Sequence, residues 1–289
     1  MRRLFAALAL VASLALVPAS QALASPHHPT GEFAPFGDCP LSHSALKACV
    51  FSESTGGFFT VGKKTVPLKN PVILQGGLEA SETGEQLFVG AEDGNTLSKT
   101  PEPVPGGLLG IEAPSWWPGF LKEWFNETIN NGFTGVTATV ELAAPASAIK
   151  LSTLNLILEK GIALSLPTKI KLSNPFLGSN CYIGSNSNPV TIEFTTGATS
   201  PPPPNESIHG ARGEFFVNET GTLVKLSGGK LVNNSFAAPE ANGCGGLFSF
   251  LIDPFVNEIV GLPSAAGHNT AVLEGVLETA DPNAVRASE

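Results

Sequence analysis

Three histidines lie in the body of the chain, and a nucleophilic hydrolase would have to use one of them: His43, His209 or His268. His209, in "NESIHGARGE", and His268, in "SAAGHNT", stand in glycine-flanked turns with hydroxyl or carboxylate side chains nearby in sequence. Closeness along the chain does not make a Ser-His-acid arrangement, which is defined by its geometry. We therefore assign no catalytic residue, and a secreted hydrolase of unrecognised type that uses His209 or His268 is the alternative function.

Acidic side chains are dense in only two segments, 79–86 and 91–96. A calcium loop needs alternating carboxylate ligands, and the whole chain has only four aspartates. We interpret both segments as solvated turns on either side of a strand over 85–90. The sequence also lacks H-E-x-x-H, G-x-S-x-G and G-x-G-x-x-G. We expect no bound metal and no cofactor.

All three tryptophans lie within "PSWWPGFLKEWF", residues 114–125. The spacing predicts a helix from about 118 to 130, in which the large apolar side chains make one face. That face consists of Trp117, Phe120, Leu121, Trp124, Phe125 and Ile129. We expect it to pack on the β core, because a fully exposed face would exceed the apolar patch of an ordinary soluble monomer. Trp116 falls outside the stripe and is the tryptophan expected to face solvent.

The alternative for the aromatic segment is a surface that contacts a partner. The candidate binding residues are then Trp116, Trp117, Phe120 and Trp124, within the region 105–133. A cell-surface glycan, a lipid and a protein remain open as partners. Lys122 is the only basic residue on the polar face, where it stands among acidic residues. This composition disfavours a helix lying in a membrane interface, because the polar face of such a helix usually carries lysine and arginine.

Four cysteines, an even number, predict two disulfides in an exported chain. Of the three pairings, Cys39–Cys49 with Cys181–Cys244 is preferred, since each bridge then stays within one half of the chain. A four-thiolate metal site is the alternative, but it needs closer spacing of the cysteines and reducing conditions.

The first 24 residues predict a secretory signal peptide, with basic Arg2 and Arg3, an apolar stretch and the A-x-A site at 22–24. The apolar stretch is shorter than the roughly 20 residues that span a bilayer. We expect a secreted, extracellular or cell-wall-associated product with no transmembrane segment in the mature chain. Residues 25–37 are expected to form a flexible leader and 281–289 a flexible tail.

The charge balance excludes some partners. Signal removal takes away two basic residues and no acidic one, so the net charge of −9 becomes about −11. This disfavours nucleic acid and anionic membrane as electrostatic partners. With 42% hydrophobic residues, the chain can bury a substantial core.

β-Branched and alternating patterns predict short strands separated by turns over most of the chain. Within the strand expected over 162–172, Pro167 indicates an edge or a bend. We expect a mainly-β fold, a β-sandwich or barrel-like set of antiparallel sheets with two or three short helices. Strands are expected within 56–68, 71–75, 85–90, 134–142, 162–172, 189–196, 213–236 and 269–280, with a helix as the alternative for the last.

Two further helices are predicted, over 152–161 and 253–261, the second with Asp253 as N-cap, Pro254 in the first turn and Gly261 just past its end. All these elements are expected in one mainly-β domain over 38–280. The alternative is two related β modules divided near 105–150, because "GGFFTVGKKTVPL" (56–68) and "GEFFVNETGTLVKL" (213–226) both place paired phenylalanines before a turn.

The cysteine-containing stretches carry a family resemblance. "NPFLGSNCYIGSNSNPVTIEFTTGATSPPPPNESIHG" (174–210), "SFAAPEANGCGG" (235–246), "GLPSAAGHNTAVLEGVLETA" (261–280) and "FGDCPL…CVFS…VPLKNPVILQGG" (36–77) resemble an uncharacterised group of exported proteins of actinobacteria. The resemblance implies an exported, disulfide-bonded product and brings no catalytic residues. The leading hypothesis is thus a non-catalytic secreted or cell-envelope protein that binds a surface polymer, lipid or protein through 105–133.

Overall fold

A computed structural model describes residues 27–80, 86–130 and 133–289. Within helix α1 (Gly119–Asn130) it describes side chains up to residue 125. The expected signal peptide lies outside the described residues, as do the side chain of Ile129 and most of the acidic segment 79–86.

The first and last thirds of the chain form one antiparallel sheet. Its strand order is β11-β12-β14-β1-β3-β4, and β2 pairs with the far end of β1. Strand β1 runs along β14 from Cys49 opposite Ala280 to Thr60 opposite Thr270. This pairing does not fit two β modules divided near 105–150, because strands from both halves share the sheet. The strands are β1 (Leu46–Val61), β2 (Lys64–Pro67), β3 (Val72–Ala80), β4 (Gln86–Gly90), β11 (Glu214–Val217), β12 (Leu223–Asn233) and β14 (Thr270–Ala280).

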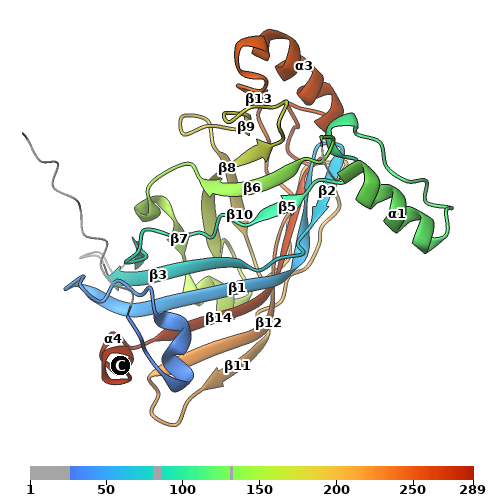
Figure 1. Cartoon of the computed structure of the whole chain (residues 1–289). Coiled ribbons are helices and arrows are strands. Elements are labelled where there is room, and N and C mark those ends of the chain that lie inside the picture. Colours follow the sequence, from blue (N-terminus) through green and yellow to red (C-terminus); the bar gives the residue numbers. More distant parts are fainter. Residues whose placement is uncertain (1–26, 81–85, 131–132) are drawn as a thin grey trace, which may run out of the picture.

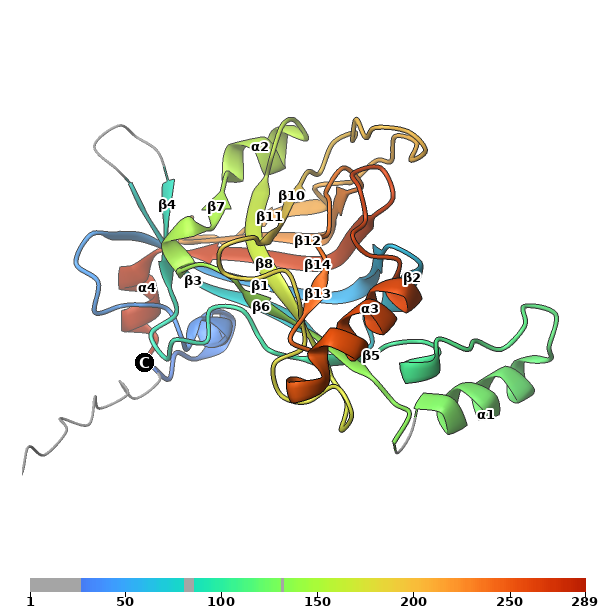
Figure 2. The same cartoon turned by 90° about the horizontal axis from the view of Figure 1, so that it is seen from above.

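The middle of the chain forms the second antiparallel sheet around β8. Its order is β13-β9-β8-β6-β5, and β7 and β10 also pair with β8. The strands are β5 (Pro101–Pro103), β6 (Thr137–Leu142), β7 (Lys150–Leu151), β8 (Leu164–Ser173), β9 (Tyr182–Ile183), β10 (Val190–Phe194) and β13 (Ala241–Asn242). Figures 1 and 2 show the two sheets facing each other, and their inward side chains form one core cluster. The predicted mainly-β, sandwich-like fold is confirmed.

Pro167 lies in the centre of this second sheet and not at an edge. Strand β8 has partners on both sides, with Thr191 of β10 opposite Pro167. On the other side, Pro167 falls in the gap between β6 and β7, where its carbonyl accepts a hydrogen bond from Ala143. A proline lacks the N–H that a ladder needs, so a gap between partner strands accommodates it.

Four short α-helices and four 3-10 turns connect the described strands. Helix α2 forms as expected, capped by Ser152, whose hydroxyl accepts a hydrogen bond from the Asn155 backbone. Helix α3 also forms and ends at Gly261 in the left-handed conformation, as predicted. The elements are η1 (Gly31–Phe36), η2 (Gly107–Leu109), α1 (Gly119–Asn130), η3 (Ala146–Ala148), α2 (Thr153–Leu158), η4 (Gly246–Phe248), α3 (Ser249–Val260) and α4 (Pro282–Ala287).

The predicted start of α3 is wrong. The helix begins at Ser249, and Asp253 lies inside it instead of capping it. The Asp253 carboxylate accepts hydrogen bonds from the backbone of Gly243, at 3.2 Å, and Cys244, at 2.7 Å. A tertiary contact therefore uses the side chain that the sequence pattern assigned to the cap.

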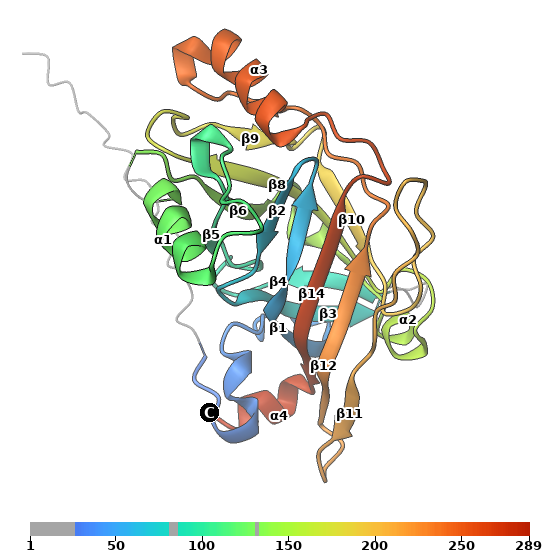
Figure 3. The same cartoon turned by 90° about the vertical axis from the view of Figure 1, so that its right-hand side faces the viewer.

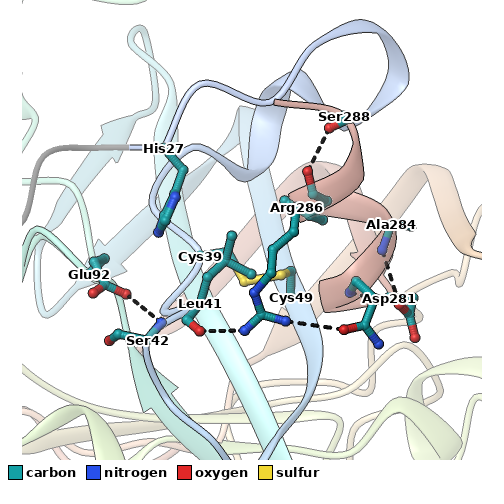
Figure 4. The surroundings of a disulfide bond; sticks show 12 residues. His27, Cys39, Leu41, Ser42, Cys49, Glu92, Asp281, Ala284, Arg286 and Ser288 are labelled. Carbon is teal, nitrogen blue, oxygen red and sulfur yellow. Dashed lines mark hydrogen bonds between the residues drawn. A yellow bond between two sulfur atoms is a disulfide. The ribbon is translucent and has the colours of Figure 1, made fainter.

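Neither described terminal segment is a flexible tail. Phe36 of η1 is 1% exposed and Val285 of α4 is fully buried, and both belong to a small core beside the first disulfide. The Arg286 guanidinium donates to the Leu41 carbonyl across this junction (Figure 4). Apolar residues anchor each segment, so the expectations for 25–37 and 281–289 are corrected for the residues described.

Both predicted disulfides are present. Cys39–Cys49 joins the segment after η1 to β1 (Figure 4), and Cys181–Cys244 joins the start of β9 to the loop before η4. The two pairs account for every cysteine, which removes the four-thiolate metal alternative.

Candidate binding site at the apolar end

The aromatic stripe of α1 does not pack on the β core. Trp116 is 80% exposed, Phe120 70% and Trp124 63%. Trp117 is half-buried and packs edge-on against Phe125, with ring centroids 5.5 Å apart. Helix α1 projects away from both sheets (Figures 1 and 2), and the ring of Trp117 contacts those of Trp116 and Phe125. The expectation of a core-facing stripe is therefore wrong, while that of an exposed Trp116 is confirmed.

A second exposed apolar segment lies at the start of α3. Residues 246–251, which we call the tip, include Leu247, 94% exposed, and Phe250, 70% exposed. Phe248 and Leu251 are also exposed. The tip carries no charged side chain, and neither do the residues on either side of it from 244 to 252. Sequence analysis missed these residues, and the available signal was the uncharged run "CGGLFSFLI".

The loop before the tip is held firmly to the second sheet. Cys244 is bonded to Cys181, and the Gly245 N–H donates to the Leu177 carbonyl at 2.7 Å. The two hydrogen bonds to Asp253 fix the same loop from the helix side. The disulfide and these hydrogen bonds therefore hold the base of the tip rigidly.

The two projections belong to one surface. Phe176, next to Leu177 under the tip, contacts Phe133, which follows α1, with ring centroids 6.2 Å apart. Figures 1 and 2 place α1 and α3 toward the same side of the molecule. We call this surface the apolar end; its exposed side chains are Leu109, Ile111, Trp116, Phe120, Leu121, Trp124, Phe133, Phe176, Leu247, Phe248, Phe250, Leu251 and Phe255.

Charges near the apolar end are few and mostly paired. Lys64 forms an ion pair with Glu112 at 2.8 Å, and Lys63 forms one with Glu258 at 3.3 Å. The Lys122 ammonium donates to the Ser115 carbonyl. This end therefore has no strong field of either sign.

An apolar cavity of about 70 Å³ lies between the sheets, behind the apolar end. Protein interiors contain few voids larger than a water molecule. The cavity is lined by Phe59, Val61, Lys64, Val66, Leu68, Val72, Ser98, Thr100, Glu102, Val104, Ala138, Val140, Ile170, Leu172, Ile183 and Val260.

Two buried ionisable side chains line this cavity. The Glu102 carboxylate is fully engaged, accepting from the backbone of Lys69 at 3.1 Å and of Asn70 at 2.8 Å. Lys64 is 8% exposed, and besides Glu112 its ammonium donates to the Gly110 carbonyl at 3.3 Å. Lys64 is thus the one lining residue that carries a cationic group, and that group is bound by Gly110 and Glu112.

The histidines do not assemble a catalytic arrangement in the described part of the chain. His209 and His268 are both exposed, and neither imidazole has a hydroxyl or carboxylate partner among the described residues. His43 pairs with Glu79 at 2.5 Å on the molecular surface. The described residues also contain no group of three or more potential metal ligands.

The described acidic side chains of 91–96 hold turns. Asp93 accepts from the Asn95 backbone at 2.7 Å, and Glu92 accepts from that of Ser42. Burial and the nearby Asp93 carboxylate raise the pKa of Asp38, while a hydrogen bond from Gln75 acts in the opposite direction. These contacts explain the cluster without a ligand.

No described helix is long and apolar enough to span a membrane. No protein-family model matches the sequence, and no curated protein or solved structure is significantly similar to it. The case for a function therefore depends on the apolar end and the cavity behind it.

Proposed function

We propose that this is a non-catalytic exported protein of the cell envelope that docks on a lipid surface through the apolar end. The exposure of Leu247 and Phe250 at a rigidly held, uncharged tip is the observation that carries the proposal. Burying a large apolar side chain contributes roughly 1.5–3 kcal/mol. A few such side chains entering the acyl region together suffice for peripheral binding.

The chemistry of the surface favours lipid over a protein partner. Protein interfaces concentrate binding energy in tryptophan, tyrosine and arginine. Most exposed side chains of the apolar end are phenylalanine and leucine; Trp116 and Trp124 are its only residues of those three types, and neither Arg212 nor Arg286, the arginines of the described chain, belongs to it. The side chains also come from separate projections, a shape that enters a fluid surface more readily than it matches a flat partner.

A glycan is likewise disfavoured as the partner. Specific ligand sites combine apolar surface with placed polar groups that fix orientation. The tip offers one hydroxyl, that of Ser249, and the only tyrosine of the chain, Tyr182, lies under the Lys169 ammonium in the second sheet. The tip therefore lacks the hydrogen-bonding groups by which a sugar would be held.

The absence of a basic face selects the kind of lipid. Interfacial helices that bind anionic membranes carry lysine and arginine on their polar face, whereas Lys122 is the only base on α1. The scarcity of basic residues on α1 therefore disfavours binding to anionic membranes in particular. We therefore propose a zwitterionic or neutral lipid surface.

Co-flotation with phosphatidylcholine vesicles tests the proposal. We expect the mature protein to float with these vesicles, and Phe250→Asp to bind at least ten-fold more weakly because a carboxylate must then enter the acyl region. The matched control is Phe216→Asp on β11, where another exposed phenylalanine lies at the other end of the molecule (Figure 3).

The control variant should float like the unchanged protein. The proposal is contradicted if the unchanged protein stays in solution, if Phe250→Asp floats equally well, or if both Asp variants lose binding to the same degree.

A further inference from the structure

The central cavity is the middle member of a row of three apolar cavities. A cavity of about 30 Å³ under η2 and α3 shares Lys64, Val104, Leu172 and Val260 with it. A third of about 40 Å³, deeper between the sheets, shares Phe59, Val72 and Val140 with it. The shared side chains place neighbouring cavities next to each other, so the three spaces follow one another in a row.

Strand β8 gives the length of the row. Leu172 lines the two cavities nearer the apolar end, and Leu164 lines the deepest one. Eight residues of strand span about 26 Å. The acyl chains of one leaflet cross about 15 Å, half of a hydrocarbon core about 30 Å thick. The row is therefore long enough for one extended acyl chain.

Lys64 supplies a polar group near the outer end of the row. Its side chain lines both the central and the outer cavity, and Gly110 and Glu112 accept two of its hydrogen bonds. An ammonium has three donors, and no further acceptor for Lys64 is found among the described residues. Glu112 is about half exposed, so an anionic head group can displace it from the Lys64 ammonium.

The outer cavity lies between two elements that also belong to the apolar end. The outer cavity is enclosed by Gly107 and Leu108 of η2 on one side and by Phe255, Val256 and Ile259 of α3 on the other. These two elements also carry exposed apolar side chains of the apolar end, among them Leu109. A molecule leaving a lipid layer would meet this junction first.

We propose that the interior binds one single-chain amphiphile with an anionic head group, such as a long-chain carboxylic acid. The acyl chain lies along β8 between the sheets, and the carboxylate lies at the Lys64 ammonium. This inference goes beyond surface docking, and it holds for an amphiphile supplied in solution as well as one taken from a membrane.

Titration of the delipidated mature protein with hexadecanoic acid, followed by native mass spectrometry and calorimetry, tests the interior site. We expect one molecule bound per chain. Val140 lines both the central and the deepest cavity. Val140→Trp should therefore fill part of the cavity space and weaken binding at least ten-fold. Leu154→Trp, which adds the same side chain on exposed α2, should bind like the unchanged protein.

Lys64→Met tests the head group without filling the cavities. It should weaken binding of hexadecanoic acid about ten-fold and leave binding of hexadecanol unchanged, which also covers the case that Val140→Trp fails to fold. The inference is overturned if the unchanged protein binds neither amphiphile, if a folded Val140→Trp binds normally, or if Lys64→Met affects acid and alcohol equally.

The two proposals can fail separately. Phe250→Asp leaves the cavity lining intact and should still bind hexadecanoic acid, while Val140→Trp leaves the tip intact and should still float with vesicles. Loss of only one property would identify the proposal that is wrong.

Discussion

Asp253 holds the loop before the tip through two backbone hydrogen bonds, to Gly243 and Cys244. Hydrogen bonds to a charged acceptor each contribute more than neutral ones. This one side chain therefore links α3 to the strand region from which the tip projects.

Replacing Asp253 by alanine should lower the free energy of unfolding by about 2 kcal/mol, because two backbone donors lose their acceptor. Asp253→Asn keeps one acceptor oxygen and should fall between alanine and the unchanged protein. Urea unfolding of the three proteins measures this order, and equal stabilities would show that the carboxylate does not hold the loop.

The α1 element shows how the same pattern can serve core or surface. Phe120 is 70% exposed, whereas Phe194 of β10 is fully buried between the sheets. Phe120→Ala should change the free energy of unfolding by no more than about 0.5 kcal/mol, as surface substitutions usually do. Phe194→Ala should cost about 3–5 kcal/mol.

Thermal and urea unfolding of both variants checks this contrast. A loss of several kcal/mol in Phe120→Ala would mean that α1 packs on the core after all, as the helical periodicity alone suggested.

The positions of the strands were more predictable from the sequence than what packs against each helix. Alternation in segments such as 134–142 and 269–280 identifies strands β6 and β14 because one face of each is buried. The apolar stripe of α1 identifies a helix but not what covers it, since core and docking helices share the same periodicity. The start of α3 was missed because Asp253 is used in a tertiary contact.

At the scale of the whole molecule, the two disulfides lie at opposite ends. Cys39–Cys49 fastens the buried η1 and α4 region (Figure 4), whereas Cys181–Cys244 supports the base of the tip. The second closes the longer loop, with a sequence separation of 63 against 10. In the chain-entropy model, it therefore stabilises the fold more.

Removing Cys181–Cys244 by alanine substitution of both cysteines should cost about 4 kcal/mol and weaken vesicle binding. Removing Cys39–Cys49 in the same way should cost about 3 kcal/mol and leave vesicle binding of the folded protein unchanged. Chemical unfolding measures the stability of each variant, and flotation at 10 °C measures its vesicle binding. Equal loss of binding in both variants would argue against a specific support for the tip.

The even cysteine count, and the preference for bridges that stay within one half of the chain, were sufficient to predict both disulfides. The candidate site was only partly predictable: of the four residues proposed from the sequence, Trp116, Phe120 and Trp124 are exposed at the apolar end and Trp117 is half-buried, while the tip and the cavity row were not predicted. Such features depend on which strands face each other, and the pairing of β1 with β14 joins residues more than 200 positions apart. No local pattern encodes that arrangement.

Intrinsic tryptophan fluorescence tests the lipid-docking claim most directly, because all three tryptophans belong to the segment 114–125 at the apolar end. On addition of phosphatidylcholine vesicles, we predict a blue shift of the emission, and quenching when the acyl chains are brominated. Emission that stays unchanged and unquenched at a large excess of lipid would contradict lipid docking through the apolar end.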